Sequence, residues 1–122
     1  MSNPLALIIE DDFDLSTIFA AALKASGFET EIVRDGRVAV QRLATATPDV
    51  VVLDLHLPHV AGTDILDQIR ADARLTETRV IVTTADARMA EMLHDQADLV
   101  LVKPISFGQL RDLAGRLSAA AS

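Results

Sequence analysis

The stretch DVVVLDLHLPHVAG, residues 49–62, carries the clearest structural signal in this sequence. Its apolar run, residues 50–53, lacks the alternation of a half-solvated strand and therefore predicts a strand covered on both faces. Asp54 ends this run with a carboxylate, although aspartate is depleted in strands and an unpaired buried carboxylate is costly. Taken alone, Asp54 fits a solvated cap of the following turn. The rest of the chain decides whether it is more than that.

Length and composition predict one domain, residues 1–122, with half of its residues apolar. No apolar run is long enough to cross a bilayer, so the sequence does not predict a membrane protein. The first residues, MSNPLALII, lack a basic segment and a cleavage site, which predicts a cytoplasmic protein. The chain has no cysteine, and this excludes disulfides, thiolate nucleophiles and cysteine-based zinc sites.

The charge balance argues against nucleic-acid binding through this domain. The formal net charge is −7, with 18 acidic and 11 basic side chains, and the chain contains four Phe but no Trp or Tyr. It therefore has neither a basic stripe nor a platform of aromatic rings on which bases could stack.

Strand-like runs alternate with segments of helical spacing five times. Such alternation predicts a parallel sheet, because right-handed crossovers between parallel strands need a helix-sized connection. The expected strands are residues 5–9, 29–33, 50–53, 80–83 and 99–102.

Helical spacing and capping residues predict the helices between these strands. In the first, Leu15, Ile18, Phe19 and Ala22 form an apolar stripe, and Gly27 is a stop signal. The expected caps are Asp35 for the second helix, Thr63 or Asp64 for the third, Asp86 for the fourth (about residues 87–95), and Ser106 with Gln109 for the fifth.

Polar residues with complementary chemistry follow four of the five strands. The carboxyl ends of parallel strands share one edge of a sheet, where ligands bind at the point at which strand order reverses. If the first and third strands are neighbours, Asp11 and Asp54 face each other there. The residues at these ends are Glu10, Asp11, Asp12, Asp54, Thr83, Thr84 and Lys103.

Clustered carboxylates without His or Cys at tetrahedral spacing favour a hard cation, so Glu10, Asp11 and Asp54 predict a Mg²⁺ site. A carboxylate can also be a nucleophile that forms an aspartyl phosphate. Such an acceptor needs a metal, a cation and a hydroxyl donor around the phosphoryl oxygens. Lys103 and Thr84 supply the last two. The simpler alternatives are helix capping for Asp12 and Asp14, a plain strand ending for the two threonines, and a turn for Lys103–Pro104.

The order and spacing of LIIEDD, RDG, VVVLDLHLPHVAG, VIVTTAD and LVLVKP resemble the receiver domain of two-component response regulators, such as the bacterial chemotaxis regulator. The resemblance covers nearly the whole chain. It implies a single flavodoxin-like three-layer α/β domain, with five helices around a five-stranded parallel sheet in the order 2-1-3-4-5.

By position, the resemblance implies a role for each site residue. Asp54 matches the phosphate acceptor, Glu10 and Asp11 the acidic pair that holds Mg²⁺, and His56 the residue whose backbone carbonyl also binds the metal. Thr84 matches the switch hydroxyl, and Lys103 the cation that precedes a peptide bond usually cis in the family. Val100 departs from the pattern, because many receivers carry Tyr or Phe there. The side chains of His56 and Asp86 are expected to tune phosphoryl lifetime.

The function that this implies is Mg²⁺-dependent phosphoryl transfer from a phosphohistidine of a sensor kinase or phosphotransfer protein to Asp54. The switched surface would be the fourth helix, fifth strand and fifth helix, facing a target protein, an output domain of the same chain or a second copy. One alternative is an interaction module that works without phosphorylation, although none of the site residues is lost. Another is an aspartyl phosphatase or mutase, which needs a carboxylate close after the nucleophile; Leu55 and His56 stand there instead.

Overall fold

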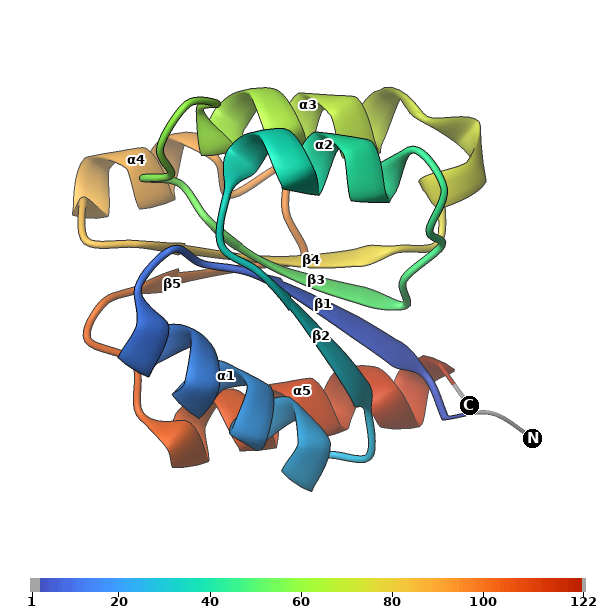
Figure 1. The fold of residues 1–122 in the computed structure, drawn as a ribbon. Coiled ribbons are helices and arrows are strands. Elements are labelled where there is room, and N and C mark those ends of the chain that lie inside the picture. The colour runs from blue at the N-terminus through green and yellow to red at the C-terminus, as the bar shows by residue number, and fades with distance from the viewer. Residues whose placement is uncertain (1–2, 122) are drawn as a thin grey trace.

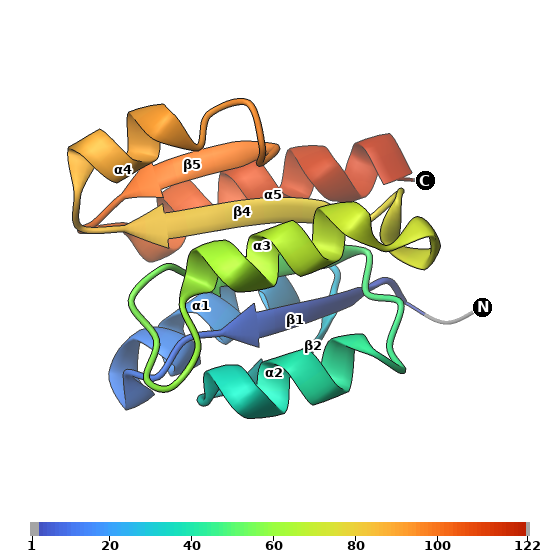
Figure 2. The ribbon, with the colours of Figure 1, turned by 90° about the horizontal axis from the view of Figure 1, so that it is seen from above.

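The computed structural model describes residues 3–121, with side chains to residue 117, and contains one parallel sheet in the order β2-β1-β3-β4-β5. This is the predicted strand order, and all five predicted strands are confirmed with ends that shift by at most one residue. The strands are β1 (Leu5–Ile9), β2 (Glu29–Val33), β3 (Val50–Asp54), β4 (Arg79–Thr84) and β5 (Leu99–Val102). Figure 2 shows β1 and β4 running in the same direction under α3.

Helices cover both faces of the sheet, which gives the three predicted layers. In Figure 1, α2, α3 and α4 lie on one face, and α1 and α5 lie on the other. The helices are α1 (Phe13–Ala25), α2 (Gly36–Leu43), α3 (Gly62–Ala71), the short 3-10 helix η1 (Ala73–Leu75), α4 (Ala87–Met92) and α5 (Phe107–Ala121).

Each strand of the sheet centre contributes side chains to two separate apolar cores. In β1, Leu7 and Ile9 pack with residues of α2 and α3, whereas Ala6 and Ile8 pack with residues of α1 and α5. Every residue of β3 is buried, as its unbroken apolar run predicted. Asp54 is thus the carboxylate at the end of a strand that is held on both faces.

Most predicted helix caps are present. Asp35 Oδ1 accepts the Arg37 N–H at 2.7 Å, and Ser106 Oγ accepts the Gln109 N–H at 3.0 Å. Asp12 caps α1 by accepting the Leu15 N–H at 2.8 Å, in agreement with its interpretation as a cap. Asp86 caps α4.

Three details of the helix predictions were wrong. Neither Thr63 nor Asp64 caps α3, because the helix begins at Gly62 after Ala61, which makes no side-chain cap. Ile18 is 41% exposed, because the buried face of α1 is turned toward α5 as well as the sheet and is filled by Phe19, Ala20 and Leu23 instead. The fourth helix ends at Met92 and not near residue 95, because Leu93 has a non-helical backbone and its side chain packs in the core.

Among the described residues, no helix combines the length and the apolar character needed to span a membrane.

Candidate functional site

The carboxyl edge of the sheet gathers the polar residues that follow its strands. Ile9 of β1 lies beside Leu53 of β3 in register, so Glu10 and Asp54 continue two adjacent strands. Ligand oxygens of Glu10, Asp11 and Asp54 all lie within 4.8 Å of one another. Glu10 and Asp54 are buried, with 1% and 2% exposure, whereas Asp11 is exposed.

Lys103, directly after β5, reaches two carboxylates of this cluster. Its Nζ donates to Glu10 Oε1 at 2.8 Å and lies 3.5 Å from Asp54 Oδ1. The Lys103 N–H also donates to the Thr84 carbonyl at 2.7 Å, which fixes the start of the side chain beside β4. The Lys103–Pro104 peptide bond is cis, as the resemblance implied.

The electrostatics of the cluster favour the uptake of positive charge. Burial, together with the neighbouring Asp54, raises the pKa of Glu10 to about 7. The hydrogen bonds that Glu10 accepts from the Lys103 side chain and from the Asp12 backbone N–H act in the opposite direction. Burial lowers the pKa of Lys103, but its hydrogen bond to Glu10 and the charge of Asp54 outweigh that effect and leave the pKa above its ordinary value. One ammonium group therefore compensates two buried carboxyl groups only in part.

The three carboxyl groups suit a hard divalent cation. They offer only oxygen ligands, two of them buried, and a divalent cation would supply the positive charge that Lys103 does not. Both His56 and Asp54 take part in the same turn, because the His56 N–H donates to Asp54 Oδ1 at 3.1 Å. Among the residues whose side chains are described, no hydrogen bond to the His56 carbonyl oxygen is found.

Thr84 ends β4 with a hydroxyl that has two neighbours. Its Oγ1 accepts the Asp86 N–H at 3.0 Å and lies 3.2 Å from His56 Nε2. The side chain is fully buried, whereas the His56 ring is exposed. The Asp86 carboxylate accepts the N–H groups of Arg88 and Met89 and so caps α4. Sequence reasoning did not foresee the contact between His56 and Thr84, because nothing in the spacing of 28 residues indicates it.

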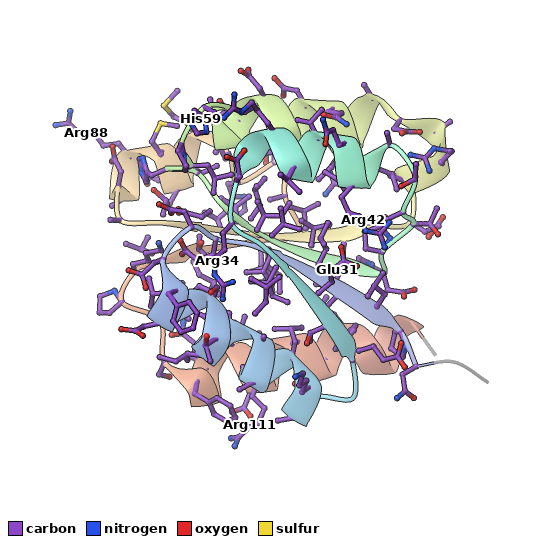
Figure 3. All side chains as sticks on the ribbon, in the orientation of Figure 1. Glu31, Arg34, Arg42, His59, Arg88 and Arg111 are labelled. Carbon is purple, nitrogen blue, oxygen red and sulfur yellow. The ribbon has the colours of Figure 1, made fainter. Side chains whose placement is uncertain are left out.

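The loop from Leu55 to Ala61 is held close to the acceptor strand. Leu55 N–H donates to the Thr83 carbonyl at 3.1 Å, and Gly62 N–H donates to the Leu55 carbonyl at 3.2 Å. Farther along the loop, His59 adopts a φ of 73° and its Nδ1 lies 3.0 Å from Asp35 Oδ2. His56 and His59 thus contact different partners, which argues against a shared metal site; Figure 3 shows His59 at the α3 end of this loop.

Next to the site, α4 and β5 form a hollow of about 510 Å³. Ala87, Ala90, Val100 and Val102 supply most of its apolar lining, and Arg88, Glu91 and His94 its polar lining. Val100 carries no ring that could fill this space. Arg88 extends from α4 into the solvent (Figure 3), and Met92 is 72% exposed beside it.

Comparisons with known proteins agree with this geometry. A family model described as the response regulator receiver domain matches residues 6–114. The sensory transduction protein RegX3 of Mycobacterium tuberculosis (strain H37Rv) is 36% identical over 115 residues, which make up 93% of this chain and 48% of RegX3. The DNA-binding response regulator MtrA of M. tuberculosis (strain CDC 1551) is 31% identical over 98 residues, or 80% of this chain and 43% of MtrA. The chain therefore spans about half the length of these relatives.

The solved structure of the chemotaxis response regulator CheY4 of Vibrio cholerae has the same fold. It superposes with a TM-score of 0.85 and 22% identity, over 95% of this chain and 99% of that chain.

Proposed function

The chain belongs to the response regulator receiver domain family, and we propose that Asp54 is the residue that accepts its phosphoryl group. The observation that carries this proposal is the placement of Asp54. Its carboxylate is buried at the end of β3, within reach of two further carboxylates and of Lys103 Nζ at 3.5 Å. A nucleophile in this position is held rigidly and lies beside a cation that can attract the transferred group.

The transfer makes one bond and breaks one. A carboxylate oxygen of Asp54 attacks the phosphorus atom of a phosphohistidine, the P–O bond forms, the P–N bond breaks, and the imidazole leaves with the electron pair of the P–N bond. The donor is a phosphohistidine of a sensor kinase or phosphotransfer protein, and family membership supports this choice. In this proposal donor and receiver meet in the cytoplasm.

Mg²⁺ is the cofactor that the site fits. Glu10, Asp11 and Asp54, with the backbone carbonyl of His56, would hold it. When bound, it would neutralise the negative charge of the phosphoryl oxygens. Lys103 pairs with one phosphoryl oxygen and the Thr84 hydroxyl donates to another. The domain in this sense catalyses only its own phosphorylation and the later hydrolysis of the acyl phosphate.

The side chains of His56 and Asp86 are proposed to tune this hydrolysis. Each follows a site residue by two positions, His56 after Asp54 and Asp86 after Thr84, where a side chain flanks the path of the attacking water. Changing both to Ala is expected to alter the dephosphorylation rate measured on the purified phosphoprotein. An unchanged rate would contradict this role.

Phosphorylation is proposed to bias a surface made by α4, β5 and α5. The Thr84 hydroxyl accepts a hydrogen bond from the backbone N–H of Asp86, the residue that caps α4. A shift of this hydroxyl toward the phosphoryl group therefore moves the start of that helix. The exposed apolar side chains Met92 and Val102 lie on this surface. Its reader is a target protein, an output domain of the same polypeptide or a second copy of the domain. A DNA-binding output, such as the name of MtrA states for that relative, is the first to test.

Intact-mass measurement tests the proposal directly. Incubation with Mg²⁺ and acetyl phosphate should add the mass of one phosphoryl group to the wild-type protein. Asp54→Asn should show no adduct, and a chelator should prevent it in the wild type. Asp14→Asn, which changes an exposed carboxylate in the first turn of α1, is the matched control and should be phosphorylated normally. If the wild type acquires no adduct from acetyl phosphate or from a kinase, the domain is an interaction module that works without phosphorylation.

A further inference from the structure

The hydroxyl group of Thr84 has one proton, and the contacts of its oxygen limit where that proton can go. The oxygen already accepts the Asp86 N–H at 3.0 Å, and the side chain is fully buried, so water does not reach it. Within the described part of the chain, the other polar atom bonded to this oxygen is His56 Nε2 at 3.2 Å. A buried donor without an acceptor is costly. Among the contacts of the described residues, this one offers the Thr84 proton an acceptor, namely the ring nitrogen His56 Nε2 when that nitrogen carries no hydrogen.

We propose that His56 is a positioning residue that holds the Thr84 hydroxyl in the unphosphorylated protein and competes with the phosphoryl group for its proton. This inference rests on the proposed function, in which Thr84 donates to the phosphoryl group. It differs from the tuning of hydrolysis, because it concerns the resting position of the switch and not the path of water.

The connections of His56 give this competition a direction. Its backbone N–H donates to Asp54 Oδ1 at 3.1 Å, and its ring contacts Thr84, so a single residue touches both the acceptor and the hydroxyl. The Thr84 hydroxyl in turn accepts a hydrogen bond from the backbone N–H of Asp86, whose carboxylate caps α4. A phosphoryl group on Asp54 draws the Thr84 proton away from His56, and the start of α4 follows the hydroxyl.

The size of the effect follows from the strength of one hydrogen bond. A neutral hydrogen bond contributes a net 0.5–1.5 kcal/mol, which corresponds to about a 2-fold to 13-fold change in an equilibrium constant. Removing the acceptor on His56 should shift the switch toward its activated position by a factor in this range. The activated state then forms at lower concentrations of a phosphoryl analogue.

Two variants of His56 separate its hydrogen bond from its bulk. His56→Leu has a side chain of similar size but no hydrogen-bond acceptor. His56→Gln keeps an acceptor at a similar reach and should restore the wild-type behaviour. Thr84→Val removes the hydroxyl and keeps the shape, so that a double-mutant cycle isolates the contact.

The experiment is a titration of the full chain with beryllofluoride in the presence of Mg²⁺, followed by the NMR signal of the Thr84 methyl group. His56→Leu should bind beryllofluoride about 2-fold to 13-fold more tightly than the wild type. Its Thr84 methyl signal should already be displaced toward the activated position without the ligand. In the Thr84→Val background, His56→Leu should leave the affinity for beryllofluoride unchanged.

A nitrogen-15 spectrum of the histidine rings tests the direction of the hydrogen bond. His56 Nε2 should lack a proton in the resting protein; a protonated Nε2 would overturn the proposal. Equal beryllofluoride affinity of His56→Leu and the wild type would also overturn it. If the wild type itself binds no beryllofluoride, the proposed phosphoryl-accepting function fails, which is a different result from failure of the His56 contact.

Discussion

A methyl group at Gly62 is expected to lower both the stability of the domain and the rate at which Asp54 is phosphorylated. A Cβ atom placed there would lie 2.5 Å from the Cα of Leu55, 2.6 Å from the Asp54 carbonyl oxygen and 3.0 Å from the Leu55 carbonyl carbon. Carbon atoms pack at about 3.5–4.0 Å. All three contacts are backbone atoms of the acceptor segment, so α3 and β3 must separate by about 1 Å.

This geometry sets the expected magnitudes. Overpacking of a filled interior costs about 1–3 kcal/mol. The better helix propensity of Ala returns at most about 1 kcal/mol, and less at the first residue of a helix. We therefore expect Gly62→Ala to lower the free energy of unfolding by about 2 kcal/mol. Because a misplacement of about 1 Å can cost about 100-fold in rate, phosphorylation of the folded variant should slow at least about tenfold.

Urea unfolding measures the free energy of unfolding of Gly62→Ala. The rate of adduct formation from acetyl phosphate with Mg²⁺, normalised to the folded fraction, measures its phosphorylation rate. Gly115→Ala in α5 is the control, because among the described residues no atom beyond the chain neighbours and the helix's own backbone lies within 4 Å of the Cβ that it adds. That variant should be as stable as the wild type or more stable by about 0.5–1 kcal/mol, with an unchanged rate. A Gly62→Ala protein with wild-type stability and rate would refute the argument that close backbone packing positions Asp54.

Three further outcomes are expected. The pKa of Glu10 is about 7 in the folded protein against an ordinary 4.5, so its protonated form stabilises the fold fully below about pH 4.5, and this stability is lost as the pH rises through 7. Without divalent metal, the unfolding free energy of the wild type should therefore fall by about 3 kcal/mol relative to Glu10→Gln between pH 4.5 and 8. Parallel pH profiles of the two proteins would contradict this. The Thr83 hydroxyl is buried without a hydrogen-bond partner among the described residues, so Thr83→Val should stabilise the domain by about 1 kcal/mol in urea unfolding. Thr84→Val should instead destabilise it by a similar amount, because the Asp86 N–H loses its acceptor. Gly27 has a φ of 98°, and beyond its two chain neighbours no atom of the described residues lies within 4 Å of an added Cβ. Gly27→Ala should therefore cost about 1 kcal/mol in thermal or urea unfolding through backbone strain alone, and a neutral effect would show that the turn relaxes.

The sheet and the gathering of the site were predictable because both follow from patterns local to each strand. The apolar run from Val50 to Leu53 predicts a strand covered on both faces. In a parallel sheet, the polar residue that follows each strand must lie at the shared carboxyl edge. Lys103 is an example: it follows β5, 93 residues from Glu10, yet the parallel order brings the two side chains to 2.8 Å.

Helix ends were less predictable, because capping preferences compete with packing. Thr63 and Asp64 are both good caps, but close packing of Gly62 against Leu55 starts α3 earlier. The apolar stripe of α1 likewise placed Ile18 inside, whereas packing against a second helix turned it outward.

The contacts within the site could not be predicted from the sequence. The hydrogen bond between His56 and Thr84 depends on the rotamer of an exposed ring in a loop, and no periodicity encodes a rotamer. The raised pKa of Glu10 likewise depends on how deeply its carboxyl group is buried beside Asp54, which spacing alone does not give.

The two amide protons that follow Asp54 are bonded in different ways. The Leu55 N–H donates across the sheet to the Thr83 carbonyl, whereas the His56 N–H donates to the Asp54 carboxylate itself. Exchange of the Leu55 proton with solvent deuterium requires the strands to separate, but exchange of the His56 proton responds to the chemical state of the acceptor. Two adjacent amides therefore form an internal reference and a reporter, with which the occupancy of Asp54 can be followed in the intact protein without a chemical tag.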